Sequence, residues 1–354
     1  MKIGILTFYK VLNYGAVLQA YALQKTLQKM GHDVFLINYQ PKELIKPYKT
    51  IKIKYLRKID YLLKWYRRFF LFRPFKCFIG NYLNEGIVYT SLQQLIDNPP
   101  AADAYVVGSD QVWNLRLSGN SDTFFLSFGG GRIMKIAYAA SCGGNYSFLN
   151  DENKLRLLRD FNSVSVREKS LRDELSKKDF NSEVVLDPTF LWSNYSEFIR
   201  ENNNGNYILV YYVVNNSNFR NKLKYLKKIL KLSVINIGPD YIGDADKNLR
   251  GVSPSEWVNL LHHAECVYTN SFHGVAFSIN LGKKFLYIPN GKAGDSRVLD
   301  LLFEIGLQSR VINEYHDIDK CINAKEFPIA NDVLTQMREH SLQFLSQINQ
   351  RFEK

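Results

Sequence analysis

The sequence lacks several features that would assign it to common protein classes. Only four cysteines occur among its 354 residues, and they are scattered with no CxxC pair. This spacing argues against a cysteine-based zinc site and favours a reduced protein of the cytoplasm. No run of about 18 uncharged apolar residues occurs, so we expect no transmembrane helix. The N-terminus runs directly into a strand-like segment, without the apolar region and cleavage site of a signal peptide.

A dinucleotide-binding fingerprint is also absent, although the chain opens with a strand, a helix and a second strand. The loop between the first strand and the helix contains Asn13, Tyr14 and Gly15 instead of a G-x-G-x-x-G sequence. Small side chains at this turn would let a ligand approach the backbone. We therefore predict that these three residues contact substrate.

Strand and helix patterns alternate along the whole chain, which is typical of parallel sheets with helices on both faces. The length and a hydrophobic content of 46% suffice for two cores of ordinary size. The polar run 201–206 is the best candidate for a linker. We predict two Rossmann-like α/β domains that face each other across a cleft, at 1–195 and 206–330, followed by a C-terminal helix at 331–354.

The segment 269–274, with the sequence TNSFHG, is the first candidate for a reactive centre. It joins a short apolar strand to a helix and contains Ser271 and His273. In open α/β sheets, ligands bind beside such loops, and a helix N-terminus favours anions. A histidine there could exchange a proton with a bound anion. The alternative is a buried histidine that only caps the helix.

Cations follow this segment within one strand–helix unit. Lys292 lies just past the next strand, and Arg297 lies at the start of the following helix, so both are predicted to bind an anion. Arg167 also follows a strand, in the first domain, and its guanidinium suits phosphate or carboxylate. The alternative for Arg167 is a surface salt bridge with Glu168. If the two sheets face each other, Arg167 and His273 would line one cleft.

Two further strand ends contain polar residues. Ser109 and Asp110 follow a strand in the first domain, where Asp110 could bind sugar hydroxyls, act as a base or cap the next helix. The segment 187–189, with the sequence DPT, is predicted to end a strand and form a hinge rather than a site.

An ordered set of short motifs resembles the polysaccharide pyruvyltransferase family over about residues 1–310. Each motif is weak by itself, but the set in this order is specific. The resemblance implies a GT-B-like pair of Rossmann domains and transfer of pyruvate from phosphoenolpyruvate to a sugar, which forms a cyclic ketal. The motifs are Asn13–Leu23, Val107–Asn114, Ser165–Glu168, Leu186–Thr189 and Ser271–Gly274.

The family also implies roles for individual residues. In relatives, an arginine matching Arg167, a histidine matching His273 and a lysine about twenty residues later act in donor binding and catalysis. Lys292 lies nineteen residues after His273, so this match needs a gap of one residue. Some relatives have arginine two residues before the histidine. Ser271 stands there in this chain, which leaves the positive charge to Arg297 or another group.

This reaction agrees with the anion-binding and acid/base roles predicted above from the residues themselves. Phosphoenolpyruvate carries a phosphate and a carboxylate, so its site needs cations and helix N-termini. We expect His273 to act as general acid/base or phosphate partner, with Asp110 as a second catalytic candidate. No metal-binding cluster is visible, and the reaction needs no cofactor beyond the donor. The expected acceptor is a sugar of a bacterial-type surface polysaccharide or of its lipid-linked precursor.

The net charge of +12 is concentrated in one segment. Residues 42–76 contain twelve Lys and Arg and two acids, and the stretch 42–78 also contains ten aromatic residues. Basic and aromatic residues together suit an anionic membrane surface. We therefore predict that this insert holds the enzyme at the inner face of the membrane, beside a lipid-linked acceptor. The alternative is an ordinary helix with aromatics on the core and cations in water.

Three other functions fit parts of the sequence. A GT-B glycosyltransferase with a nucleotide-sugar donor would share the fold, and Asp295 could then mimic the acidic residue of its donor site. A nucleic-acid-binding protein would use the basic insert, but no RRM, KH, HTH or zinc-finger pattern occurs, and we expect no specific nucleic-acid binding. The third is a scaffold without activity, although the candidate site residues are intact.

Overall fold

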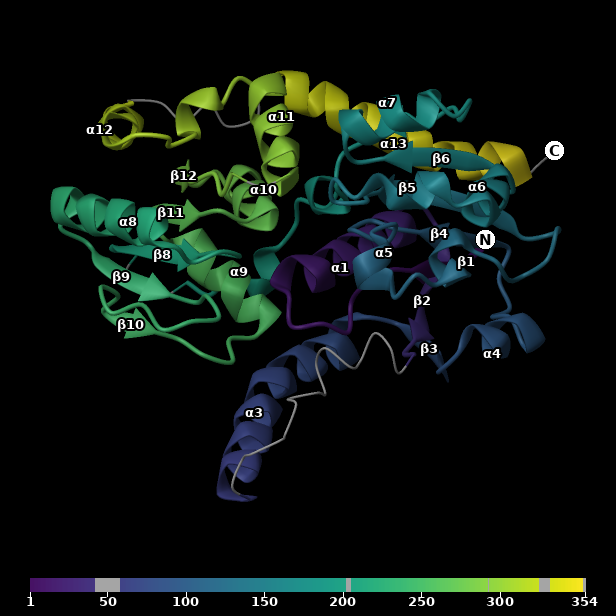
Figure 1. The fold of residues 1–354 in the computed structure, drawn as a ribbon, viewed down its shortest axis with the longest axis horizontal. Helices are drawn as coiled ribbons and strands as arrows, with labels where there is room; N and C mark the ends of the chain where they lie inside the picture. Colours follow the sequence, from purple (N-terminus) through teal and green to yellow (C-terminus); the bar gives the residue numbers. More distant parts are fainter. Residues whose placement is uncertain (42–57, 202–204, 292, 325–331, 353–354) are drawn as a thin grey trace. The chain divides into compact units, whose positions relative to one another are not determined.

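The computed structural model describes residues 1–41, 58–201, 205–291, 293–324 and 332–352 (Figure 1). The chain divides into two compact units. Unit 1 comprises Met1–Phe69, Lys76–Trp192 and Met337–Lys354, and unit 2 comprises Phe70–Phe75 and Ser193–Gln336.

Unit 1 contains a sheet of seven parallel strands in the order β3-β2-β1-β4-β5-β6-β7. In the register of the central strands, Ile3 of β1 lies opposite Val34 of β2 and Ala104 of β4. This order is that of a Rossmann fold with one extra strand. The strands are β1 (Lys2–Leu6), β2 (Asp33–Tyr39), β3 (Glu85–Tyr89), β4 (Ala104–Val107), β5 (Met134–Ala140), β6 (Ser163–Val166) and β7 (Glu183–Val184).

Helices connect the strands of unit 1, as parallel strands require. The helix α1 begins where Asn13 accepts a hydrogen bond from the backbone N–H of Ala16 (3.2 Å), and Gly31 follows its end with φ +90°. The helices are α1 (Tyr14–Lys29), α4 (Leu92–Asp97), α5 (Leu115–Ser118), α6 (Glu152–Arg159) and α7 (Lys169–Ser176), with 3₁₀ turns η1 (Asp122–Phe125), η2 (Tyr146–Asn150) and η3 (Pro188–Phe190).

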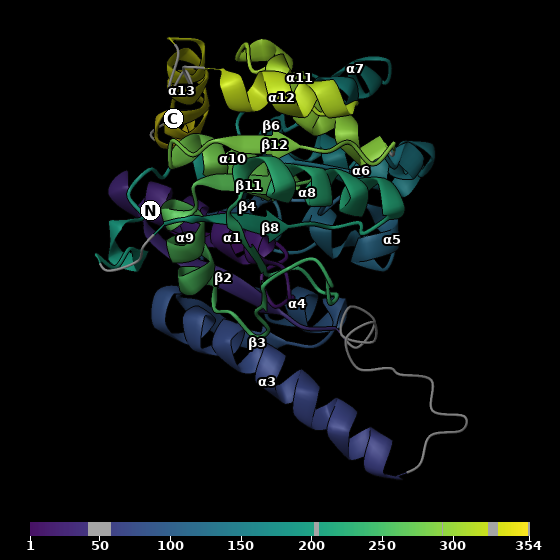
Figure 2. The same ribbon diagram turned by 90° about the vertical axis from the view of Figure 1, so that its left-hand side faces the viewer.

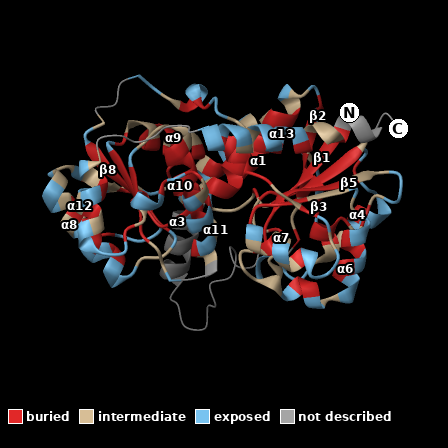
Figure 3. Cartoon of the chain, turned by 90° about the horizontal axis from the view of Figure 1, so that it is seen from above, coloured by how far each residue is buried: buried red, intermediate tan, exposed pale blue. Residues whose placement is uncertain are grey.

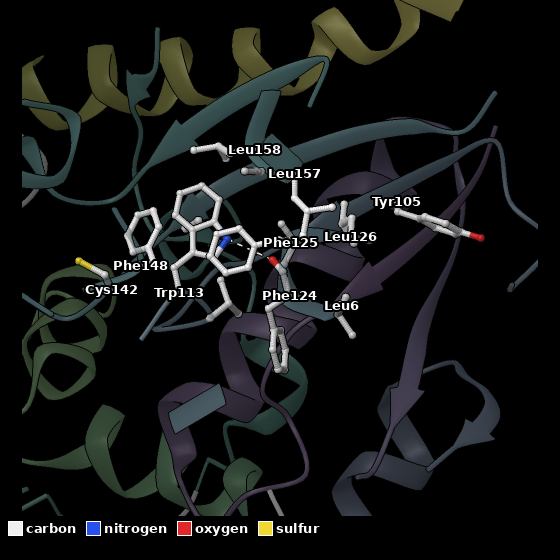
Figure 4. Packing of buried hydrophobic residues seen from close by; sticks show 14 of the residues in the cluster. Leu6, Tyr105, Trp113, Phe124, Phe125, Leu126, Cys142, Phe148, Leu157 and Leu158 are labelled. Atoms are coloured by element: carbon white, nitrogen blue, oxygen red, sulfur yellow. Dashed lines mark hydrogen bonds between the residues drawn. The ribbon is translucent and has the colours of Figure 1, made fainter. Parts of the chain in front are cut away.

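Burial follows the pattern of each element in unit 1. All four residues of β4 are buried, whereas α6 alternates buried and exposed positions (Figure 3). Trp113 lies at the centre of the aromatic core, where its Nε1–H donates to the carbonyl of Phe124 (3.1 Å) and its ring stacks on Phe125 at 5.7 Å (Figure 4). The indole therefore contributes apolar area without leaving its N–H unpaired.

The C-terminal helix α13 (Asp332–Phe352) packs mainly on unit 1. Ser341 accepts a hydrogen bond from the backbone N–H of Leu186 (2.9 Å), and Arg338 donates to the carbonyl of Phe190 (2.9 Å). The rings of Phe344 and Tyr138 lie 6.1 Å apart. These contacts fasten the helix beside the end of β7.

Unit 2 repeats the same plan with five parallel strands in the order β10-β9-β8-β11-β12. The strands are β8 (Tyr207–Tyr211), β9 (Ser233–Asn236), β10 (Lys247–Asn248), β11 (Cys266–Thr269) and β12 (Phe285–Tyr287). The helices are α8 (Ser217–Leu230), α9 (Pro254–His263), α10 (Phe272–Asn280), α11 (Ser296–Glu304) and α12 (Tyr315–Asn323), with turns η4 (Ser196–Phe198), η5 (Ala293–Asp295) and η6 (Gln308–Arg310).

The basic insert includes the long helix α3 (Lys58–Tyr82), which has Pro74 in its interior (Figure 2). The helix ends four residues beyond the predicted limit of the insert, and residues 42–57 of the insert lie outside the described part of the chain. Among the described residues, no helix combines the length and the apolar character that crossing a bilayer requires.

Candidate functional site

The strand order of unit 2 creates a switch point between β8 and β11. The chain runs outward in opposite directions from these two strands, and in open parallel sheets ligands bind outside the carboxyl ends at such a point. Asn270 joins the two loops, because its Oδ1 accepts from the N–H of Val213 (2.7 Å) and its Nδ2 donates to the carbonyl of Val214 (2.7 Å). The TNSFHG segment lies at this point.

His273 lies in the first turn of α10, directly at the switch point, and only 8% of it is exposed. Ser271 caps the helix by accepting from the N–H of Gly274 (3.4 Å), and its own N–H donates to Thr269 Oγ1 (3.0 Å). A Cβ on Gly274 would lie 2.3 Å from the same hydroxyl, so glycine is required for this tight start. The serine, not the histidine, caps α10. The first-turn N–H groups make this end of the helix favourable for an anion.

The loop after the neighbouring strand β12 lies against this segment. Asn270 Nδ2 donates to Asn290 Oδ1 (2.8 Å), and Asp295 fixes the loop by accepting from the N–H groups of Asn290 and Gly291 (both 2.7 Å). Asp295 also accepts from the hydroxyl of Tyr287 (2.6 Å), whose pKa is raised by burial and by this carboxylate. These contacts give Asp295 a structural role in the loop.

Arg297 comes beside the start of α10, as its guanidinium lies 5.9 Å from the ring centroid of Phe272. Phe272 precedes His273, so a predicted cation and the predicted acid/base belong to one small region. Lys292 lies outside the described residues, and its role stays a prediction.

Unit 1 has an equivalent switch point between β1 and β4. Thr7, just past β1, donates from Oγ1 to the backbone carbonyl of Ser109, just past β4 (2.9 Å). Gln19 of α1 donates to the same Thr7 hydroxyl (2.9 Å). The predicted residues Asn13, Tyr14 and Gly15 form the start of α1, the helix that contains Gln19. The buried hydrogen bonds of Gln19 and Thr7 therefore connect this helix to the predicted loop that contains Ser109.

Arg167 is held inside unit 1 by an acidic partner. Its side chain is 3% exposed, and Nη1 donates to Asp187 Oδ2 at 2.9 Å. The Oγ of Ser109 donates to the same oxygen (3.1 Å), while Thr189 donates to Asp187 Oδ1 from both N–H (3.1 Å) and Oγ1 (2.8 Å). The alternative for Arg167 was a surface salt bridge with Glu168 or a neighbour. Arg167 does form ion pairs, with Asp187 at 2.9 Å and Glu168 at 3.6 Å, but they are buried and not on the surface.

Three carboxylates set the charge around Arg167. Burial by itself would lower the pKa of Arg167, but the charges of Glu168, Asp187 and Asp110 outweigh burial and raise it. Glu168 Oε1 lies 3.6 Å from Arg167 Nε and accepts from the hydroxyl of Ser141 (2.5 Å). The guanidinium is thus fixed in place and positively charged.

One role can be excluded for each of two residues near Arg167, namely Cys142 and Asp110. Burial and the Glu168 charge raise the pKa of Cys142 to about 12, so its thiol is not a thiolate nucleophile at neutral pH. The alternative that Asp110 caps the next helix is wrong, because Asn114 caps α5 by accepting from the N–H of Arg116 (3.2 Å). Asp110 itself has φ +71°, and its carbonyl accepts from the N–H groups of Val112 (2.8 Å) and Ser141 (3.1 Å).

A family model described as polysaccharide pyruvyl transferase matches residues 13–292, which is most of the chain. The chain belongs to this family. The matched range includes the start of α1 at residues 13–15, the Arg167–Asp187 pair and the TNSFHG segment. The family model therefore covers the candidate residues of both units except Arg297. No curated protein matches the sequence.

Solved structures show the fold that this family member shares with other enzymes. The UDP-GlcNAc 2-epimerase from Neisseria meningitidis bound to UDP-GlcNAc has a TM-score of 0.53 and 11% identity, covering 98% of this chain and 100% of that one. A putative UDP-N-acetylglucosamine 2-epimerase from Listeria monocytogenes has a TM-score of 0.50 and 12% identity, covering 100% and 96%. The fold is therefore GT-B-like, with two Rossmann-like units.

Sequence reasoning missed part of the polar network of this transferase family member. Asp187 was predicted to form a hinge, yet it is 1% exposed and accepts four hydrogen bonds at the centre of the network. Ser141, which follows β5, was not singled out as a site residue. Both residues follow strands of the parallel sheet, and this position is the signal that could have identified them. Arg167 lies in unit 1 and His273 in unit 2, and the predicted cleft between them stays a prediction.

Proposed function

We propose that this protein transfers pyruvate from phosphoenolpyruvate to two hydroxyls of one sugar in a surface polysaccharide or its lipid-linked precursor. The observation that carries the proposal is the family match over residues 13–292, which includes His273 at the switch point of unit 2. A polysaccharide pyruvyl transferase needs a pyruvate donor and a glycan acceptor. Phosphoenolpyruvate is a chemically activated form of pyruvate, since its enol phosphate has a good leaving group.

The proposed reaction has three steps. A proton adds to C3 of phosphoenolpyruvate, and a sugar hydroxyl attacks the cationic C2. Phosphate then leaves with its bridging oxygen, and a second hydroxyl of the same sugar attacks C2 to close the ketal ring. The two hydroxyls lose two protons, of which one balances the new methyl group and the other leaves with phosphate. The steps need an acid/base and a stable site for an anionic donor.

His273 is proposed as the acid/base or as a phosphate partner. The N–H groups at the start of α10, Arg297 and Lys292 would bind the phosphate and carboxylate of the donor, with Arg167 as a further anion contact. Ser271 caps the helix that presents His273. Support comes from the burial of His273 beside the helix start and from the closeness of Arg297 to Phe272.

Unit 1 is proposed to contribute the acceptor contacts. Ser109 and Asp110 follow β4, and Asn13, Tyr14 and Gly15 begin α1, so both groups lie at the switch point of the unit 1 sheet. A carboxylate such as that of Asp110 can accept a hydrogen bond from a sugar hydroxyl or take its proton.

The test is donor choice. The purified protein should release phosphate from phosphoenolpyruvate in the presence of galactosyl, mannosyl or glucosyl acceptors, with a mass gain in the acceptor from the ketal. The control arm replaces phosphoenolpyruvate with UDP-GlcNAc and measures UDP release. Nucleotide release without phosphate release from phosphoenolpyruvate would replace this proposal with a nucleotide-sugar glycosyltransferase.

The basic insert is proposed to hold the enzyme at an anionic membrane surface, where a lipid-linked acceptor would lie. Changing Lys64, Arg67 and Arg68 to glutamine should weaken binding to phosphatidylserine vesicles about a hundredfold at low salt, since each cation near the surface contributes about 1 kcal/mol. Vesicle sedimentation measures the bound fraction.

The matched control changes three exposed cations of α8, namely Arg220, Lys224 and Lys228, to glutamine and removes the same charge from unit 2. We expect this control to bind the vesicles as the unchanged protein does. Equal loss in both triple variants, or no loss in either, would contradict a membrane role for the insert.

A further inference from the structure

Unit 1 contains a cavity near the amino ends of its strands, whereas the switch point lies at their carboxyl ends. Its volume is about 660 Å³, within the range of small-molecule sites. Lys135 lines it from the second position of β5, whereas Ser141 follows the other end of the same strand. Six residues of extended strand separate the two by about 20 Å. The cavity is thus a separate place from the candidate site at the carboxyl ends.

The lysine in this cavity has an unusual environment. Lys135 is only 8% exposed, yet no ion pair or side-chain hydrogen bond joins its amine to another residue of the described part of the chain. Its backbone is fully used, with the N–H donating to Asn162 Oδ1 (2.8 Å) and the carbonyl accepting from the N–H of Asn162 (2.8 Å). Buried cations are normally paired, so this amine calls for an acceptor from outside the chain.

A second polar side chain belongs to the lining of this cavity. The Oγ of Ser127 is buried and has no hydrogen-bond partner among the residues that the structure describes. Serine hydroxyls can donate one hydrogen bond and accept two. An amine without a protein acceptor and a hydroxyl without a partner among the described residues, both in one lining, indicate a ligand that accepts hydrogen bonds.

Among the charged groups of the lining, Lys135 is the one that a ligand with an anionic group would pair with. Arg156 adds a second cation at the rim, where its Nη2 donates to Asn153 Oδ1 (3.0 Å). The lining carboxylate of Asp122 contacts Lys154 at 3.2 Å, and this lysine also contacts Asp151 at 2.7 Å. Asp160 is exposed, and its charge raises the pKa of Lys135 but does not overcome the lowering that burial causes.

The walls of the cavity are built by residues that the fold fixes in place. Leu157 of α6, labelled in Figure 4, and Phe128 form apolar surface beside the polar groups. Phe128 packs on Tyr105 with ring centroids 5.0 Å apart. Gly129 follows with φ +88°, and a Cβ there would lie 2.4 Å from Cε2 of Tyr105. The close approach of this loop to the tyrosine therefore requires glycine at position 129.

We infer that this cavity binds a sugar unit that carries an acidic group, with Lys135 and Arg156 on the acid and Ser127 on a ring or hydroxyl oxygen. The volume exceeds what a small inorganic anion needs, and the mixture of apolar wall, amides and hydroxyl suits a sugar ring. That this sugar belongs to the acceptor glycan rests on the proposed function, whereas the binding itself does not.

The experiment is calorimetry of the full chain with three probes: methyl glucuronide, glucose 1-phosphate and methyl glucoside. The first two separate a carboxylate from a phosphate source of the acid, and the third lacks an acid. We expect at least one acidic sugar to bind at least tenfold more tightly than methyl glucoside. Lys135→Met should weaken that binding about tenfold or more, and Ser127→Ala about fivefold, as expected for a charged and a neutral hydrogen bond.

Folding and specificity controls keep the result clear. Methionine fills similar space without a buried charge, so Lys135→Met should unfold at the same or a higher urea concentration than the unchanged protein. The matched control is Lys178→Gln, which removes an exposed cation of unit 1 and should bind the acidic sugar normally. The inference is overturned by an absence of saturable binding for both acidic sugars, by unchanged binding in Lys135→Met, or by inorganic phosphate binding as tightly as either sugar.

Discussion

Replacing Asp187 with alanine should destabilise unit 1 by about 3–5 kcal/mol, the usual cost of breaking a buried ion pair from one side. The change leaves the Arg167 guanidinium buried without its nearest carboxylate. It also removes the acceptor of the Thr189 hydroxyl and one of the two acceptors of the Ser109 hydroxyl, which can still donate to the carbonyl of Ala139. Urea unfolding followed by hydrogen exchange in peptides from β5 to β7 would measure the loss within unit 1, separately from unit 2.

The control for this change is an ion pair of the same type on the surface. Asp173 contacts Arg172 at 2.7 Å with side chains 57% and 43% exposed, and Asp173→Ala should cost at most about 1 kcal/mol. Equal losses in the Asp187 and Asp173 variants would mean that burial does not strengthen the dependence of Arg167 on its partner. That outcome would contradict the prediction.

A double variant separates folding from activity at this pair. Arg167→Met with Asp187→Leu removes both charges, so part of the lost stability should return, since apolar residues often replace a buried ion pair without loss. If Arg167 contacts the donor, pyruvyl transfer should stay lost in this variant even though it folds. Recovered transfer would limit Arg167 to a structural role.

The sequence predicts the elements of unit 2 closely where the pattern is strong and local. The sequence pattern predicts a helix from Pro254 to His263 and a strand from Cys266 to Thr269, and these agree with α9 and β11. Each has an uninterrupted apolar pattern with a clear start or stop, such as Pro254 in the first turn after the cap at Ser253.

The errors in unit 1 arise from contacts that are distant in sequence. The sequence pattern predicts a strand that starts at Val184 and is stopped by Pro188. The strand β7 ends earlier, at Val184, because the N–H of Leu186 donates to Ser341 of α13 instead of continuing the sheet. The edge strand β3 was not predicted, since Ile87 and Val88 are 63% and 55% exposed and give no burial pattern. The two-residue strand β10 is too short to produce a pattern of its own.

The residues of the candidate site also differ in whether a local sequence pattern could predict them. Ser271 and His273 could be predicted because one strand, one loop and one helix start contain them within a few residues. The pairing of Arg167 with Asp187 depends on β6 and β7 being neighbours in the sheet, which twenty residues of sequence do not reveal. The closeness of Arg297 to α10 depends likewise on β11 lying next to β12.

Replacing His273 with alanine or glutamine should reduce pyruvyl transfer about 10²- to 10⁴-fold, the usual contribution of a general acid/base. The residue lies in the first turn of a helix that begins at the switch point, where a bound anion and the imidazole can meet. Glutamine retains hydrogen-bonding capacity but cannot transfer a proton at neutral pH. Phosphate release from phosphoenolpyruvate measures the loss.

The two roles proposed for His273 give different kinetics in the glutamine variant. As the proton donor, the histidine should account for one limb of the pH profile of kcat, and that limb should disappear. As a phosphate partner, its loss should raise KM for phosphoenolpyruvate and leave the profile unchanged. The matched control is His262→Gln on α9, a half-buried histidine that precedes the amino end of β11 and so lies away from the carboxyl ends of the strands, and which should keep normal turnover. Normal turnover in both His273 variants would remove this residue from the mechanism.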